Sequence, residues 1–171
     1  MKDFEAVEAE ALIALRGQLE EAITRTSDST LVGRRVSAVL LDGAAEAAIS
    51  TCLARFNLTP GDRDTLEDSY SQLNQHLKDL GRLHSGAGVR GWPDVRRVRR
   101  VRNGAQHHQI PPDHETLVTW SASVQRFVED IVRCCLWPRP ISCYEGGDHP
   151  RRRASLRVRW RREELRKRCH R

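Results

Sequence analysis

An arginine, an asparagine and a histidine lie within six residues of one another, and these side chains could together cleave RNA. They are Arg102, Asn103 and His107, and they follow the basic run VRRVRRV. RNA supplies its own nucleophile, the ribose 2′-hydroxyl, so this cleavage needs no metal ion. A histidine whose pKa is near neutrality can move the protons, which contributes about 10²–10⁴ in rate. An arginine can stabilise the charge on the phosphoryl oxygens.

The spacing of these residues is awkward on a straight helix. Between Arg102 and His107 a helix rises about 7.5 Å and turns about 140°, whereas Asn103 and His107 share a face. Gly104 weakens a helix by about 1 kcal/mol relative to alanine. An irregular last turn, or a second subunit, could therefore bring the histidine to an arginine. A simpler interpretation is a basic helix end that favours the helix dipole by about 0.3–1 kcal/mol.

Helices are expected to position these residues, because apolar side chains recur at steps of three and four along most of the chain up to Trp137. Strand signals are nearly absent. Short loops between the helices predict an all-α fold, an antiparallel four- to five-helix bundle. The first helix is expected to stop near residues 26–28, and a long central helix should run from Leu31 to Phe56. A third helix is capped by Thr59 with Pro60 at its first position, a fourth lies between Trp92 and Pro111, and a fifth is capped by Asp113.

Each predicted helix has an apolar face that should be buried in the bundle. These faces contain Phe4, Val7, Ala11, Ala14, Leu15 and Ile23 in the first helix; Leu31, Val32, Val36, Val39, Leu40, Ala47, Ile49, Leu53 and Phe56 in the second; Leu66, Tyr70, Leu73, Leu77 and Leu80 in the third; Val95, Val98, Val101 and Ala105 in the fourth; and Leu117, Trp120, Val124, Phe127, Val128 and Ile131 in the fifth.

The 171 residues suit one domain of ordinary size, and their net charge of +6 is unevenly distributed. Residues 1–138 carry 17 basic and 19 acidic side chains, whereas residues 139–171 carry 12 basic and 4 acidic ones. We therefore divide the chain into a helical bundle, residues 1–137, and a Pro/Gly-rich linker with a basic, arginine-rich tail, residues 138–171. The tail is interpreted as a solvated extension, with an RNA-binding arm as the alternative.

Composition and cysteine usage predict a reduced, cytoplasmic protein that is not in a membrane. The first residues are acidic, and no apolar run approaches the roughly 20 residues that span a bilayer. Five cysteines form an odd set without a CxxC pair. Cys143, His149, Cys169 and His170 do not have the paired spacing of a structural zinc site, so neither a metal nor another cofactor is expected.

The arginine and histidine pattern in an all-α bundle resembles the RxxxxH signature of HEPN domains. Here the signature is RNGAQH, residues 102–107, near the end of the penultimate predicted helix. The likeness extends to the acidic, alanine-rich centre of the long second helix, LLDGAAEAAI, and to QHHQIPPDHETL before the last helix. It covers about residues 4–137.

The resemblance implies a metal-independent endoribonuclease that cuts single-stranded RNA, with its active site at a homodimer interface and an arginine and histidine set from each subunit. Arg102 corresponds to the signature arginine, Asn103 to the polar residue beside it and His107 to the signature histidine. Such domains often act in antiviral defence or as toxins. A regulatory or sensor protein partner is then expected, because unrestrained RNA cleavage harms the cell.

Some HEPN-like domains are inactive, so the alternative function is a non-catalytic helical module that binds a partner protein or nucleic acid. The arginine run is open to a similar choice, because it is either a solvated helix face or a track for RNA phosphates. The RNA-binding interpretation takes in Arg96, Arg97, Arg99, Arg100 and His108.

Asp42 and Glu46 form an i, i+4 carboxylate pair at the centre of the long second helix. Such a pair could do metal or acid–base chemistry. We favour the interpretation that the two side chains face solvent or pair with an arginine of the fourth helix.

Overall fold

Five α-helices make up the described part of the chain in this computed structural model, and no strand occurs there. The structure describes residues 2–28, 30–61, 65–83, 86, 88–108 and 113–136, with side chains described from residue 9 and, in the fourth helix, up to residue 104. The five helices belong to a single unit of the chain. They are α1 (Lys2–Thr26), α2 (Leu31–Arg55), α3 (Leu66–Asp79), α4 (Trp92–His108) and α5 (His114–Leu136).

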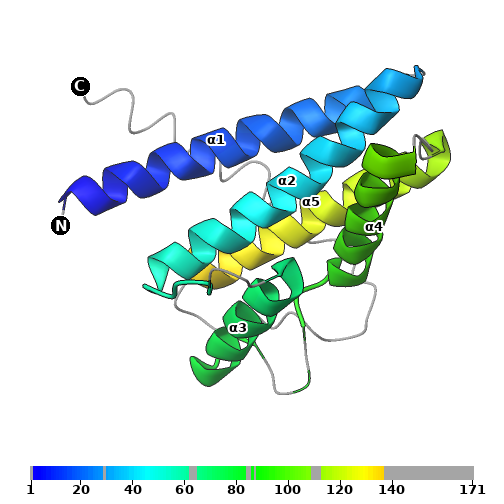
Figure 1. Ribbon diagram of the computed structural model, residues 1–171. Coiled ribbons are helices and arrows are strands. Elements are labelled where there is room, and N and C mark those ends of the chain that lie inside the picture. The colour runs from blue at the N-terminus through cyan, green and yellow to red at the C-terminus, as the bar shows by residue number, and fades with distance from the viewer. Residues whose placement is uncertain are drawn as a thin grey trace, which may run out of the picture. The chain divides into compact units, whose positions relative to one another are not determined.

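The long helix α2 is central, as the sequence predicted, because it packs against each of the other four helices. Figure 1 shows α1 and α2 as an antiparallel pair with α5 beside them, while α4 crosses near the start of α5. The Cys52 thiol of α2 reaches the Ile131 carbonyl of α5 at 3.8 Å, so these two neighbours run in the same direction. The expected bundle is confirmed, but its helices are not all antiparallel, because α3 and its loops reverse the chain before α4.

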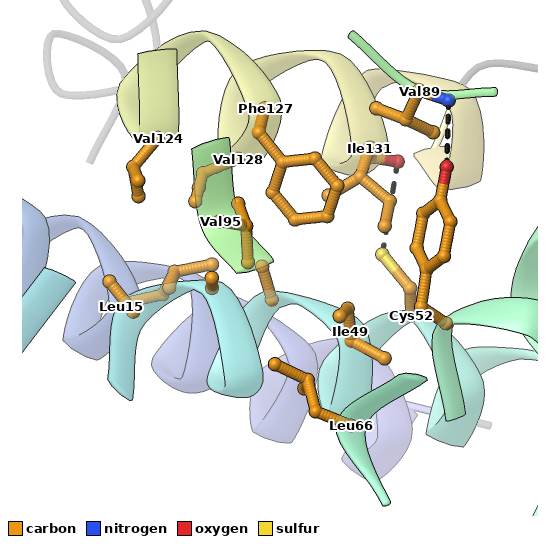
Figure 2. Packing of buried hydrophobic residues seen from close by; sticks show 14 of the residues in the cluster. Leu15, Ile49, Cys52, Leu66, Val89, Val95, Val124, Phe127, Val128 and Ile131 are labelled. Carbon is orange, nitrogen blue, oxygen red and sulfur yellow. Dashed lines mark hydrogen bonds between the residues drawn. The ribbon is translucent and has the colours of Figure 1, made fainter. Parts of the chain in front are cut away.

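The hydrophobic core lies between α2 and α5 and is closed by α1, α3 and α4 (Figure 2). It contains most of the residues expected on the third and fifth helices, and Val95 and Val98 of the fourth, whereas Val101 is only half-buried. Fully buried side chains include Leu41, Ile49, Leu53, Leu73, Leu77, Val95, Val98, Leu117, Phe127 and Ile131.

Aromatic packing fixes the start of α4. The Trp92 ring stacks on Tyr70 with 3.8 Å between ring centroids, and both rings lie near Phe127. The backbone N–H of Val89 donates to the Tyr70 hydroxyl at 2.9 Å. Gly91 has a φ of 83°, and a Cβ there would lie 2.6 Å from the Ser123 carbonyl oxygen, so glycine allows close approach to α5. The N-terminal end of α4 is therefore held in the core.

Several predicted helix boundaries are confirmed and one is wrong. The ends of α1 and α2, the start of α4 at Trp92 and the cap at Asp113 agree with the sequence, and Thr116 N–H donates to the Asp113 carboxylate at 2.8 Å. Helix α3 begins at Leu66 rather than near Pro60. Its cap is Thr65, which exchanges hydrogen bonds with Asp68 in a capping box.

The first half of α2 departs from the expected apolar face. Leu31, Val32, Val36 and Val39 are exposed, with Val32 at 68%, although all four are among the apolar positions of the predicted helix. Small residues take the buried positions instead, which lets α1 and α5 approach α2 closely; they are Gly33, Ser37, Ala38, Ala44, Ala45 and Ala48. In α1, Ala14 is likewise exposed while Leu15 is buried.

One helix among the described residues, α2, is long and apolar enough to cross a membrane. More than half of its most apolar window is buried within the bundle. Its buried side chains therefore belong to the core, and this helix is consistent with a soluble protein.

Candidate functional site

The helix that carries the RNGAQH segment is continuous. Helix α4 extends through His108, so Gly104 does not interrupt it. The irregular last turn considered from the sequence is not observed, because one glycine costs a helix only about 1 kcal/mol. Positions 102 and 107 therefore stay about 140° apart around the helix axis.

A buried carboxylate faces Arg102 from the neighbouring helix. Asp42 of α2 is 1% exposed. Its Oδ2 lies 3.6 Å from Arg102 Nε, and its Oδ1 lies 3.6 Å from Arg99 Nη1. Arg99 Nη1 also donates to Glu46 Oε2 at 3.3 Å. The expectation that these carboxylates pair with an arginine of the fourth helix is confirmed, and Asp42 does not face solvent.

Burial dominates the ionisation of Asp42. It raises the pKa of the Asp42 carboxyl, while the nearby Arg99 and Arg102 act in the opposite direction but do not outweigh it. Both contacts at 3.6 Å are longer than a hydrogen bond, so the attraction is mainly between charges. The carboxylate therefore holds Arg102 in place at a cost to the folded state.

A hydrogen bond turns Arg102 toward the next face of α4. Arg102 Nη1 donates to Asn103 Oδ1 at 3.1 Å. Asn103 lies four residues before position 107, so these two positions share a face of the helix. The Arg102 guanidinium is thus held between the α2 side of α4 and the face that carries position 107.

That exposed face of α4 also carries two arginines of the basic run. Positions 96, 100, 103 and 107 follow one another at steps of four, three and four, which places them on one stripe. Arg96, Arg100 and Asn103 are exposed. Arg97 is exposed as well and pairs with Asp94 at 2.8 Å, whereas Arg99 faces α2.

The exposed valines of α2 border the same surface, and we name Val32, Val36 and Val39 the valine stripe. The ion pair between Arg99 and Glu46 marks where α4 and α2 meet on this surface. Residue numbers fall along α2 as they rise along α4, because Glu46 contacts Arg99 and Asp42 contacts Arg102. Asn103, one turn after Arg99, and Val39, two turns before Glu46, therefore lie on the same side of this ion pair. An apolar stripe and a polar, arginine-rich stripe therefore lie next to each other.

Replacing Asp42 with asparagine should separate stability from activity. Because the pKa of Asp42 is raised in the folded protein, its charged form costs folding free energy at neutral pH. We expect Asp42→Asn to unfold at or above the wild-type temperature at pH 7, and this advantage should shrink as pH falls through the raised pKa and the wild-type carboxyl gains its proton. Any RNA cleavage that depends on Arg102, as the sequence predicts, should fall by about 10²-fold, because Arg102 loses its anchor.

Thermal unfolding across pH and a cleavage assay measure these two effects. Asp79→Asn is a suitable control, since Asp79 is exposed at the end of α3. A clearly lower unfolding temperature for Asp42→Asn at pH 7 would show that the two ion pairs outweigh the burial of the carboxylate.

Some predicted residues lie outside the described part of the structure. The side chains of His107 and His108 are not described, although both residues belong to α4. Pro111 and residues 137–171 are not described either, and the latter include the residues considered for zinc, Cys143, His149, Cys169 and His170. Among described side chains no cluster of three metal ligands occurs.

Comparison with known proteins does not add to this description. A scan against family models finds no match to the chain, and searches of curated proteins and of solved structures find no significant similarity. The resemblance to HEPN domains therefore stays a prediction that rests on the residues themselves.

Two features of the site were not predicted from the sequence. The first is the burial of Asp42, for which the signal was a lone carboxylate inside the apolar segment VLLDGAA. The second is the exposure of the valine stripe, for which the alanines and Gly33 on the buried faces of α2 were the signal.

Proposed function

We propose that this protein is a metal-independent endoribonuclease of HEPN type that cleaves single-stranded RNA as a homodimer. The 2′-hydroxyl attacks the adjacent phosphorus, and the 5′-oxygen of the next nucleotide leaves, which produces a 2′,3′-cyclic phosphate. His107 acts as general acid and base, Arg102 stabilises the phosphoryl oxygens, and Asn103 orients Arg102. Such an activity suits a cytoplasmic defence or toxin effector, restrained by a regulatory partner.

The observation that carries the proposal is the fixed position of Arg102. Asp42 and Asn103 hold its guanidinium from two sides, yet about a third of the side chain remains exposed. A guanidinium held in place loses little further freedom when it binds a phosphate, and catalysis depends on such preorganised charge. The exposed Arg96 and Arg100 on the same face as position 107 add attraction for RNA.

A second copy of the chain completes the site in this proposal. On the straight helix α4, position 107 turns away from Arg102, so the arginine needs a histidine from elsewhere. The valine stripe lies on α2, the helix whose Glu46 pairs with Arg99 and whose Asp42 faces Arg102, and it offers an apolar surface to the partner. A two-fold dimer through this stripe would set the two α4 faces opposite each other.

Cleavage of a single-stranded RNA oligonucleotide in EDTA tests the activity. We expect products that end in a 2′,3′-cyclic phosphate, and an oligonucleotide with 2′-deoxyribose at every position should stay intact because it lacks the nucleophile. Cleavage that depends strictly on added metal contradicts the mechanism. Binding without any turnover would instead support the non-catalytic helical module.

A further inference from the structure

Two cysteine thiols from different helices meet at the C-terminal ends of α2 and α5. Cys52 lies in the last turn of α2, and its Sγ donates to the Ile131 carbonyl oxygen of α5 at 3.8 Å (Figure 2). Cys135 lies one turn beyond Ile131, and a helical side chain leans back over the turn that precedes it. The Cys135 thiol in turn hydrogen-bonds to the Cys52 side chain. The two thiols are therefore in contact across the α2–α5 interface.

Both thiols are closed off from solvent in the folded protein. Cys52 is 3% exposed and Cys135 is 1% exposed. The hydrogen bond with Cys52, together with burial, raises the pKa of the Cys135 thiol, although the charges of Arg82 and Arg55 act in the opposite direction. The thiolate is the reactive form of cysteine. The pair is therefore unreactive as long as the last turn of α5 is closed.

Arg82 fastens this last turn of α5. Its Nη1 donates to the Cys134 carbonyl oxygen at 3.0 Å and to the Cys135 carbonyl oxygen at 2.7 Å. Its guanidinium also lies over the Phe56 ring, 5.3 Å from the centroid. The last carbonyls of a helix have no partner within the helix, so Arg82 supplies hydrogen bonds that α5 cannot make itself. Helix ends are the parts that open most readily, and here opening requires both bonds to break.

We propose that Cys52 and Cys135 are a modification site that forms a disulfide with glutathione disulfide as the oxidant, and that Arg82 controls access to it. When the last turn of α5 opens, the Cys135 thiolate attacks one sulfur of the oxidant, and one glutathione thiolate leaves. Cys52 then attacks the Cys135 sulfur of this mixed disulfide, and the second glutathione thiolate leaves. The two cysteines lose two electrons and two protons, and the two glutathione thiols gain them. This site is separate from the proposed ribonuclease site and does not rest on that function.

Mass spectrometry of oxidised protein tests the disulfide. The protein carries Cys143→Ser and Cys169→Ser, so that Cys52, Cys134 and Cys135 are the cysteines that remain. After incubation with glutathione disulfide, we expect a cross-linked peptide pair in this protein and in its Cys134→Ala variant, but not in its Cys135→Ala variant. Oxidised protein should unfold about 10 °C above the reduced form, because the bond closes a long loop of the chain.

Thiols at Cys52 and Cys135 that stay free, or a cross-link that needs Cys134, would overturn this site. So would a disulfide that lowers the unfolding temperature, since the folded bundle would then not accommodate the bond.

The rate of oxidation tests the role of Arg82. Arg82→Met keeps an apolar stem against Phe56 but removes the two hydrogen bonds, so disulfide formation should be about tenfold faster. Arg126→Met is the matched control, because Arg126 is an exposed arginine on α5, and it should leave the rate unchanged. Urea below the unfolding transition should hardly change the wild-type rate, since opening one turn exposes little surface. An equal rate in Arg82→Met and wild type, or a rate that rises with urea as steeply as global unfolding, contradicts control by Arg82.

Discussion

His107→Ala is expected to lower RNA cleavage by about 10²–10⁴, the usual contribution of one general acid–base group. Binding of an uncleavable 2′-O-methyl RNA should persist, because the arginines of α4 are unchanged. Single-turnover cleavage in EDTA measures the first effect, and a binding titration measures the second. His76→Ala is the control, because His76 lies on α3 and packs against Phe56.

Arg102→Ala belongs to the same test and should lose about 10²–10³ in rate, since it removes the cation held by Asp42. Arg102→Lys should recover little, because an ammonium group does not reproduce the fork of a guanidinium. Undiminished cleavage by Arg102→Ala or by His107→Ala contradicts the assignment of both residues.

Mixing two inactive variants should restore cleavage. If Arg102 of one subunit works with His107 of the partner subunit, a heterodimer of Arg102→Ala and His107→Ala contains one site with both residues and one site with neither. Random exchange of subunits gives equal numbers of homodimers and heterodimers, so we expect about a quarter of the wild-type rate. The rate should be measured after unfolding and refolding the variants together.

A mixture that stays as inactive as its components would place both residues of each site in the same subunit. As a control, Arg102→Ala mixed with the double variant Arg102→Ala/His107→Ala should show no recovery, because no site then contains both residues. Adding Val36→Asp to both partners should abolish the recovery as well, since it charges the centre of the valine stripe.

Local signals in the sequence predicted much of the fold. The Trp92-Pro93-Asp94 start of α4 and the Asp113 cap of α5 were correct because these residue types act on their own backbone. The start of α3 was wrong because Thr59 and Thr65 are both possible caps, and the reciprocal bonds between Thr65 and Asp68 decide between them.

The site was less predictable, because periodicity says which residues share a face but not which neighbour covers it. The valine stripe and the alanines of α2 are both apolar, and only the close approach of α1 and α5 buries the small residues. The burial of Asp42 likewise depends on α4 lying across it. No local rule contains that information.

The two ends of α4 are held by different kinds of contact, so a small tilt of the helix would move its far end most. Its first turn is clamped between the Tyr70 ring and α5, whereas its later turns meet α2 through the charges around Asp42. About 22 Å of helix separates Trp92 from position 107. A tilt of roughly 3° about the clamped end therefore moves position 107 by about 1 Å, a displacement that can change a catalytic rate by about 10²-fold. The clamped end of α4 lies in the core, and we expect the contact between Asp42 and Arg102 to limit the tilt of the helix.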